Sequence, residues 1–344
     1  MVSAEKFERN IKANKVFLCS IKKRIMKKNK YSTQSRKVVV VGAGAVGATY
    51  CYALAQSGLA DEIVLTDKNE DLMKGQVLDL KHGQTFFPTV EIRSGTIDDC
   101  HEAQVVVITA GAAQKPGETR LELIKKNAAI TGSIAEDIAK SGCNGVMIIV
   151  SNPVDVLTYV ALKRSGWDKS RVIGSGTVLD SSRFRQLLSK HCGVDVHNVH
   201  AYILGEHGDS EFAAWSMTNI AGINIDEYCP VCGKCAEWKT ERQLIEQQVR
   251  DSAYHIINYK GSTQFAVGLA LVKITGAILR SQNTILSVST LLESEFGIND
   301  VCLSVPCVVS DKGIMRIIES PLVLSELKSL SGSAAILRKA IDSL

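Results

Sequence analysis

The stretch that decides the fold covers residues 37–47 and reads KVVVVGAGAVG. Four consecutive valines are typical of a strand buried on both faces. Three glycines follow at once, and residues 46–57 have helical character with Gly58 as a stop signal. A second strand-like run, EIVLTD, covers residues 62–67. The sequence therefore opens with a predicted strand–helix–strand unit.

The glycines at 42, 44 and 47 have the spacing of a dinucleotide-binding turn. In such a turn they permit a sharp bend, close approach of the backbone to a pyrophosphate, and tight packing of helix on strand. The helix that follows offers free N–H groups to phosphates. Asp67 closes the second strand, where a carboxylate binds ribose hydroxyls and repels a 2′-phosphate. We expect NAD rather than NADP; a glycine-rich turn without a ligand stays the alternative.

The 344 residues suggest two domains. Strand-like runs at 105–110 (VVVITA) and 145–151 (GVMIIVS) predict an α/β, doubly wound parallel sheet of the Rossmann type over residues 36–175. Residues 176–344 predict an α+β substrate domain. Its expected elements are helices at 178–192, 239–260 and 263–281, a strand at 199–205, and antiparallel strands within 302–318 joined by an Asp-Lys-Gly turn.

Charge is distributed unevenly along the chain. Residues 1–37 hold twelve Lys and Arg against two Glu, whereas the rest holds 28 basic and 34 acidic residues. Residues 1–35 are therefore expected to be a basic, mobile extension, and the body lacks the basic surface that nucleic acid requires. No apolar run reaches the roughly 18 residues of a membrane span.

Ten cysteines without a secretory signal favour a reducing, cytoplasmic location. Three of them, Cys229, Cys232 and Cys235, have spacing that suits zinc. No fourth ligand lies near them in sequence except His255, so we expect reduced thiols and no metal.

Two segments of the second half carry groups suited to proton transfer and anion binding. The sequence GEHGD places His207 between glycines after a predicted strand, and histidine is the natural proton shuttle near neutral pH. Asp180 and Arg183 are three positions apart on a predicted helix, so they share a face. The carboxylate can orient the imidazole, and the guanidinium can bind a carboxylate. A structural histidine and an ordinary intrahelical ion pair are the alternatives.

Two loops follow strands of the predicted parallel sheet. GAAQKPGETR covers residues 111–120, and SNPVD covers residues 151–155 with Asn152 near its start. Ligands of doubly wound sheets bind at the carboxyl ends of strands. These loops are therefore expected to line the same site.

Taken together and in this order, GAGAVG, Asp67, AGAAQKPGETR, SNPVD, VLDSSRFR and GEHGDS resemble the lactate/malate dehydrogenase family, and within it the bacterial-type L-lactate dehydrogenases. The resemblance covers roughly residues 36–335. It implies an NAD-dependent oxidoreductase that interconverts pyruvate and L-lactate in fermentation. Malate dehydrogenase, another 2-hydroxy acid dehydrogenase and a catalytically silent NAD-binding protein remain alternatives.

The resemblance also implies roles for single residues. His207 gives a proton to the keto oxygen, Asp180 holds its tautomer, and Arg183 binds the substrate carboxylate. Arg120 lies on a mobile loop and polarises the carbonyl when the loop closes. Further implied contacts are Asn152 and Thr263 to the substrate, Val267 near the nicotinamide, and Val46, Gly111, Ala112, Ser133 and Ser175 to the cofactor.

Gln114 decides between the two substrates of the family. The resemblance places it opposite the variable group of the substrate, where malate dehydrogenases carry an arginine. A neutral glutamine leaves a second substrate carboxylate unpaired, which is costly in a buried site. We therefore expect pyruvate rather than oxaloacetate.

The resemblance implies regulation and assembly as well. Arg185 lies about 200° round the helix from Arg183, on the side away from the site. With His200 it matches a fructose 1,6-bisphosphate site between subunits of an allosteric homotetramer. The alternative is a surface arginine and a core histidine.

Overall fold

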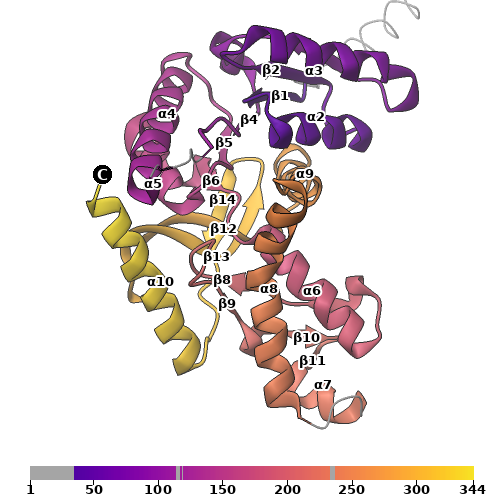
Figure 1. The fold of residues 1–344 in the computed structure, drawn as a ribbon, viewed down its shortest axis with the longest axis vertical. Coiled ribbons are helices and arrows are strands. Elements are labelled where there is room, and N and C mark those ends of the chain that lie inside the picture. The colour runs from indigo at the N-terminus through magenta and orange to yellow at the C-terminus, as the bar shows by residue number, and fades with distance from the viewer. Residues whose placement is uncertain (1–34, 114–116, 118, 233–236) are drawn as a thin grey trace, which may run out of the picture. The chain divides into compact units, whose positions relative to one another are not determined.

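A nine-stranded sheet runs through the body of the protein, which extends from Arg36 to Leu344 (Figure 1). The structure is a computed structural model and describes residues 35–113, 117, 119–232 and 237–344. The strand order is β14-β13-β12-β6-β5-β4-β1-β2-β3. Its six parallel strands are β1 (Lys37–Val41), β2 (Glu62–Thr66), β3 (Glu91–Ser94), β4 (Val105–Ile108), β5 (Val146–Ile149) and β6 (Val172–Gly174).

The valines of β1 explain why this strand is central. Val38 and Val40 pack into one core with helices α2 (Ala45–Ser57), α3 (Glu70–His82) and α9 (Phe265–Leu279). Val39 and Val41 pack into the opposite core with α4 (Arg120–Lys140) and α5 (Val154–Ser165). Successive side chains of a strand point to opposite faces, so a strand covered on both sides must be apolar throughout. This confirms the predicted doubly wound sheet.

The predicted helices are found with small shifts. Helix α2 ends at Gly58, whose φ of 62° lies in the left-handed region that glycine adopts without strain. The remaining helices are α6 (Val178–Cys192), α7 (Ile225–Cys232), α8 (Trp238–Lys260) and α10 (Leu324–Asp342). Helix α6 has the predicted bounds, whereas no range was predicted for α3, α4, α5, α7 or α10.

An antiparallel hairpin extends the parallel sheet at β6. Strand β12 (Thr284–Glu293) pairs with β6 through Ser289 and Gly174 and along its whole length with β13 (Asn299–Ser310). Strand β13 turns through Asp311 and Lys312 into β14 (Gly313–Ile317), as predicted. Strand β12 was not predicted. Through its pairing with β6, the second half of the chain joins the sheet of the first half rather than forming only separate strands.

The predicted strand at 199–205 is wrong, because it is divided between two small sheets. Strand β7 (Val199–His200) pairs with β10 (Asn219–Ile220), which also pairs with β11 (Ile223–Asn224), and β8 (Ile203–Leu204) pairs with β9 (Phe212–Ala213). Between them, hydrogen bonds go partly to side chains, while the carbonyl of Tyr202 accepts the backbone N–H of Ala214. The carbonyl of Ala201 accepts from Arg185, and the N–H of Ile203 donates to Ser181.

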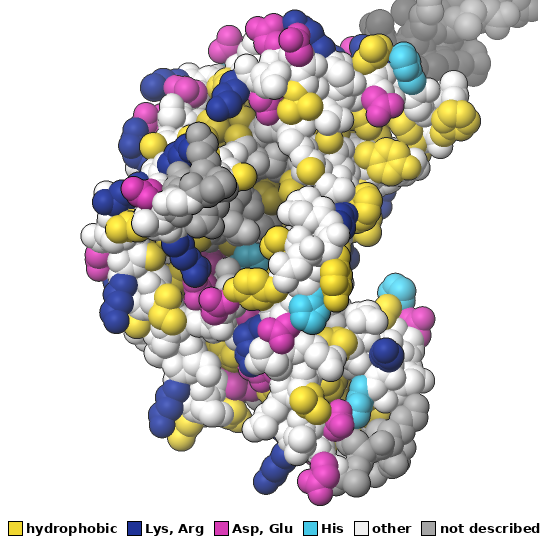
Figure 2. Space-filling view, viewed as in Figure 1, with side chains coloured by type: hydrophobic (Ala, Val, Ile, Leu, Met, Phe, Trp, Pro, Cys, Tyr) yellow, Lys and Arg dark blue, Asp and Glu magenta, His cyan; other side chains and the backbone are white. Residues whose placement is uncertain are grey.

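The surface carries charges of both signs. Figure 2 shows Lys and Arg side chains interspersed with Asp and Glu on the face in view. Among the described helices, none combines the length and apolarity needed to cross a bilayer. The predicted basic extension, residues 1–35, lies outside the described residues apart from Ser35.

Candidate active site

A cleft of about 1710 Å³ opens at the carboxyl ends of β1, β2 and β4. Strand β1 lies between β2 and β4. The sheet continues through β2 to β3 on one side of β1 and through β4 and β5 to β6 on the other, so the strand order reverses at β1. Ligands of doubly wound sheets bind at such a switch point. Of the predicted cofactor residues, the wall of the cleft includes Gly42, Gly44, Asp67, Gly111, Ala112 and Ser133.

The three glycines of the turn have different surroundings. A Cβ on Gly47 would lie 1.9 Å from the carbonyl oxygen of Gly42, so only glycine lets α2 start this close to β1. Gly42 has φ +119°, a conformation that side chains rarely adopt. A Cβ on Gly44 would meet nothing within 4 Å, which leaves open space over the first turn of α2. This open space beside the N-terminus of α2 can accommodate the pyrophosphate of a dinucleotide.

The carboxylate of Asp67 stabilises the glycine turn through backbone hydrogen bonds. Its Oδ2 accepts the N–H of Ala43 at 2.7 Å, and its Oδ1 accepts the N–H of Asn69 at 2.8 Å. Asn127 on α4 holds the neighbouring loops, because its amide bonds to the N–H of Ala112 and to the carbonyl of Asn152. Val46, Gly47 and Ser175, also predicted to bind the cofactor, are not part of the cleft wall.

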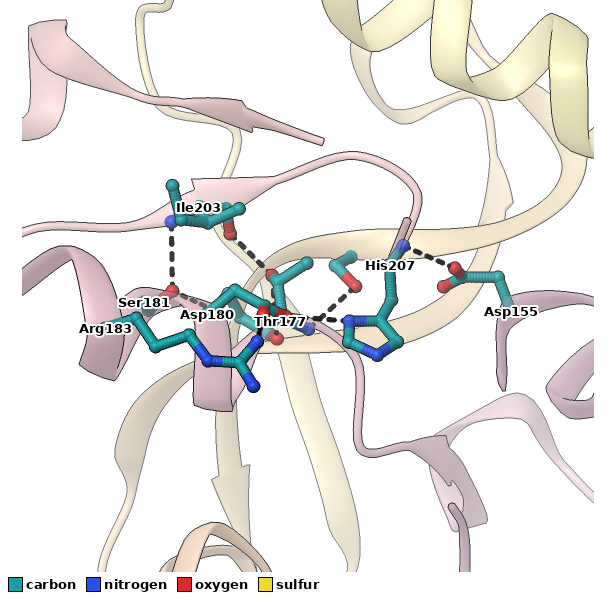
Figure 3. A network of polar contacts seen from close by, with 9 residues as sticks. Asp155, Thr177, Asp180, Ser181, Arg183, Ile203 and His207 are labelled. Atoms are coloured by element: carbon teal, nitrogen blue, oxygen red, sulfur yellow. Dashed lines mark hydrogen bonds and ion pairs between the residues drawn. The ribbon is translucent and has the colours of Figure 1, made fainter. Parts of the chain in front are cut away.

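The imidazole of His207 lies against the carboxylate of Asp180 (Figure 3). Nδ1 of His207 is 2.7 Å from Oδ2 of Asp180, and Oδ1 of Asp180 accepts a hydrogen bond from Nη1 of Arg183 at 2.5 Å. The Asp180 side chain is 2% exposed, so both contacts are shielded from water. Within the described residues Nε2 of His207 has no partner, and this nitrogen is left for a substrate. The three side chains predicted to act together are brought together.

Buried hydroxyls fix the first turn of α6 in this position. The hydroxyl of Thr177 donates to the carbonyl of Ile203 at 2.5 Å, and Ser181 accepts the N–H of Ile203 at 2.9 Å. The hydroxyls of Ser181 and Ser287 are 2.9 Å apart. Helix α6 is thereby tied to β8 and β12, and Figure 3 shows this network beside Asp180 and His207.

Charge within this cluster favours the protonated imidazole. Burial alone would lower the pKa of His207, but the charge and hydrogen bond of Asp180, with smaller contributions from Glu211 and Asp155, raise the pKa to about 9. Burial opposes ionisation of Asp180, yet His207 and Arg183 outweigh it and lower the pKa of that carboxyl. The pair is therefore an imidazolium held by a carboxylate near neutral pH.

Two buried carboxyl groups beside His207 were missed by the sequence reasoning. Oδ2 of Asp155 accepts the backbone N–H of His207 at 2.7 Å, and burial raises the pKa of Asp155 to about 6. Carboxylate oxygens of Glu211 and Asp180 and a ring nitrogen of His207 lie within 4.8 Å of one another. Asp155 is the last residue of SNPVD and Glu211 directly follows GEHGDS, but neither position in the sequence indicates a contact with His207.

The other predicted substrate residues that the structure describes differ in exposure. Arg120 is the first residue of α4 rather than part of the loop, because Thr119 and Glu122 form a capping box. Its side chain is 72% exposed, and its Nη1 is 3.9 Å from Asp209. Asn152 is exposed, and Thr263 and Val267 are half-buried around the start of α9. Gln114 lies outside the described residues.

Arg185 and His200 lie on the far side of α6. Nε of Arg185 donates to the carbonyl of Ala201 at 2.9 Å, and its guanidinium is stacked 5.2 Å from the ring centre of Tyr202. Burial lowers the pKa of Arg185. His200 is exposed and precedes Ala201 directly, so Arg185 is bonded to the residue that follows His200 at the end of β7.

The cysteine cluster is only partly described. Cys229 is buried in α7, whereas Cys235 and the side chain of Cys232 lie outside the described residues. Among the described residues, the one group of three side chains close enough to share a metal ion is Asp180, His207 and Glu211. Arg183 already neutralises Asp180 there.

Both halves of the chain match one family. Residues 36–174 match the NAD-binding domain of the lactate/malate dehydrogenases, and residues 177–344 match their alpha/beta C-terminal domain. An L-lactate dehydrogenase of Treponema denticola is 59% identical over 90% of this chain and 99% of that protein. L-lactate dehydrogenase 1 of Clostridium acetobutylicum is 50% identical over 93% of this chain and 100% of that protein.

Solved structures agree with this match. A lactate dehydrogenase from a Medee basin deep-sea metagenome library has a TM-score of 0.87 at 44% identity and covers 90% of this chain and 98% of its own. The minor L-lactate dehydrogenase of Enterococcus mundtii, in its ligands-bound form, has a TM-score of 0.87 at 40% identity and covers 91% and 99%. The chain therefore belongs to the lactate/malate dehydrogenase family and carries both of its domains, including the one that binds NAD.

Proposed function

We propose that this protein is an NAD-dependent L-lactate dehydrogenase, which reduces pyruvate with NADH to L-lactate and catalyses the reverse reaction. The observation that carries the proposal is the contact of His207 with Asp180, with Arg183 on the other oxygen of the same carboxylate. It places a proton donor and a carboxylate-binding cation side by side. The identity to proteins named L-lactate dehydrogenase supports the same activity.

His207 supplies the proton in this proposal. Since Asp180 accepts from Nδ1, the proton on Nε2 points to the keto oxygen and is transferred as that oxygen gains negative charge. In the reverse direction neutral Nε2 takes the proton from the hydroxyl. Asp180 stabilises the charged imidazolium and fixes its orientation, while the backbone N–H of His207 is anchored on Asp155.

Two arginines act on the substrate. Arg183 keeps one nitrogen on Asp180 and has Nε and Nη2 left to bind the substrate carboxylate. Arg120 stands exposed at the start of α4, directly after the loop that follows β4, and it polarises the keto oxygen when this segment closes over the substrate. Asn152 and Thr263 complete the substrate pocket.

The cleft at the carboxyl ends of the parallel strands would hold the cofactor. Gly42 and Gly44 would accommodate the pyrophosphate, Asp67 would bind the adenosine ribose, and Gly111, Ala112 and Ser133 would contact the rest of the dinucleotide. Val46, Gly47 and Ser175 are proposed as further cofactor residues. When bound, the nicotinamide supplies or accepts the hydride at the substrate carbon.

Pyruvate is preferred to oxaloacetate because Gln114 offers no charge to a second carboxylate. The test is NADH oxidation followed by absorbance with each keto acid at equal concentration. We expect a higher kcat/KM for pyruvate, and for Gln114→Arg a shift toward oxaloacetate. A native preference for oxaloacetate would assign malate as the product, and no oxidation with either acid would favour a catalytically silent NAD-binding protein.

Activation by fructose 1,6-bisphosphate is the second part of the proposal. Arg185 is bonded to the carbonyl of Ala201, the residue after His200, and a phosphate can bind the guanidinium donors that Ala201 leaves unused. We expect the sugar bisphosphate to lower the pyruvate concentration at half saturation, and Arg185→Gln to abolish the effect. Saturation curves that do not change with the effector contradict this site.

We further propose that the protein is a cytoplasmic homotetramer. Each chain would consist of the basic extension, a cofactor domain at residues 36–175 and a substrate domain at residues 176–344. Apolar side chains that a lone chain leaves in water support assembly. They lie on α2, α8 and α9 and are Tyr52, Leu244, Tyr254, Ile257, Phe265 and Leu269. Light scattering after size exclusion should give four times the mass of one chain; the mass of a single chain contradicts the proposal.

A further inference from the structure

Glu211 is a buried acid beside the proposed proton donor. Its side chain is 5% exposed, and its carboxyl lies within 4.8 Å of both the Asp180 carboxylate and the His207 ring. The two carboxyl groups are not equivalent. Asp180 is hydrogen-bonded at both oxygens, to His207 and Arg183, whereas no hydrogen bond reaches the Glu211 carboxyl from the described residues. The negative charge is therefore more stable on Asp180, and Glu211 ionises after it.

Every element packed around Glu211 contributes charge. Helix α6 presents Asp180 and Arg183, and α8 presents Arg250, whose Nη1 donates to the Glu211 carbonyl at 3.3 Å and to Glu246 at 2.9 Å. Burial and Asp180 raise the pKa of Glu211 well above its usual range, while His207, Arg183 and Arg250 oppose them.

Asp155 on α5 accepts the backbone N–H of His207, and the charge of Glu206, the residue before His207, contributes to the raised pKa of Asp155. His207 and Arg183 are bonded to Asp180, and Arg250 on α8 is paired with Glu246; together these three cations favour loss of the Glu211 proton while His207 is still charged. A carboxylate formed within 4.8 Å of an imidazolium stabilises that cation.

We propose that Glu211 is a positioning residue that sets the pH at which His207 loses its proton: Glu211 ionises first, and its negative charge then holds the imidazolium. The inference rests on the proposed function for its catalytic meaning, since keto-acid reduction requires protonated His207. Glu211 itself gives no proton to the substrate. Opposite charges at such separations move a pKa by about 1–3 units.

The test compares the native protein with Glu211→Gln, which keeps the shape and removes the charge. Two quantities are followed against pH: the NMR shift of the His207 ring without substrate, and kcat/KM for pyruvate with NADH. We expect both inflections to move to lower pH by about one unit or more. Glu211→Asp, which withdraws the charge by one methylene, should give a smaller shift in the same direction.

Glu241→Gln is the matched control, because it removes a carboxylate of α8 that lies beside His191 and outside the group of Asp180, His207 and Glu211. It should leave both inflections in place. Inflections that coincide for the native protein and Glu211→Gln overturn the proposal, as does an equal loss of rate at every pH without a shift. If Glu211→Gln does not fold, as judged by thermal melting, Glu211→Asp decides.

The two readouts separate this inference from the proposed function. A shifted NMR inflection in a protein that reduces no keto acid would leave the role of Glu211 intact and refute the activity. Rapid pyruvate reduction with unshifted inflections would refute the role of Glu211 alone.

Discussion

The backbone N–H of His207 and Oδ2 of Asp155 are joined by a hydrogen bond of 2.7 Å, although 52 positions separate the two residues. Asp155 lies in the first turn of α5, directly after the loop that leaves β5, and is 1% exposed. The bond therefore connects the parallel half of the sheet to the loop that carries the imidazole. It fixes the backbone of His207, while the bond to Asp180 fixes the imidazole ring.

Replacement of Asp155 tests this connection. Asp155→Ala leaves a buried N–H without an acceptor, and we expect a loss of about 1–3 kcal/mol in the free energy of unfolding together with a lower kcat. Asp155→Asn retains an oxygen acceptor and should recover most of the stability. Urea unfolding and initial rates measure both quantities. Equal stability of the alanine variant and the native protein would show that the bond does not hold the loop.

The pH dependence of the rates follows from the raised pKa of His207. Reduction of the keto acid needs the imidazolium, so kcat/KM should stay level up to about pH 9 and decline above it. Oxidation of the hydroxy acid needs the neutral ring, so its rate should rise up to the same pH. Initial rates in both directions across the pH range check this. A decline in reduction already near pH 6.5, the ordinary value for histidine, contradicts the cluster described here.

Asp180→Asn removes the charge that stabilises the imidazolium and keeps a side chain of the same size. We expect kcat/KM for pyruvate to fall by about 10²-fold or more, and the inflection of the pH profile to move to lower pH. Asp195→Asn, at an exposed aspartate three residues beyond the end of α6, is the control and should change neither. A rate within twofold of the native rate at every pH would exclude Asp180 from the reaction.

The glycine turn offers a matched pair of substitutions. Gly47→Ala places a Cβ 1.9 Å from a carbonyl oxygen, so we expect a lower melting temperature, equivalent to roughly 1–3 kcal/mol. Gly44→Ala meets no atom within 4 Å, so the melting temperature should stay unchanged while NADH binding weakens, because the methyl group occupies the phosphate cradle. Calorimetry and NADH fluorescence titration separate the two effects. Unchanged NADH affinity in Gly44→Ala would place the pyrophosphate elsewhere.

Local signals explain which parts of the fold were predicted from sequence. The valines of β1 and the glycine after α2 constrain their own residues directly, and these elements were predicted correctly. Strand β12 was missed although only five residues separate it from its partner β13; its other partner, β6, is distant in sequence. The run at 199–205 looks like one strand, but Ser181 and Arg185 take some of its hydrogen bonds, which only the folded chain reveals.

The same limit applies to the candidate site. His207, Asp180 and Arg183 were found because a glycine-flanked histidine and a helical i, i+3 pair are visible as patterns. Asp155 and Glu211 depend on burial and on neighbours from other elements, so the sequence gives no sign of their contacts with His207. Both lie within or beside quoted motifs, and their roles come from packing rather than spacing.

Transfer of deuterium from NADH tests the central claim most directly. The protein would be incubated with pyruvate and NADH that carries deuterium at both C4 positions, and the product analysed by mass spectrometry and on a chiral column. The account predicts that the native protein forms L-lactate with one deuterium at C2. His207→Ala should form this product much more slowly. No deuterated lactate, or a faster deuterated product from oxaloacetate, would contradict it.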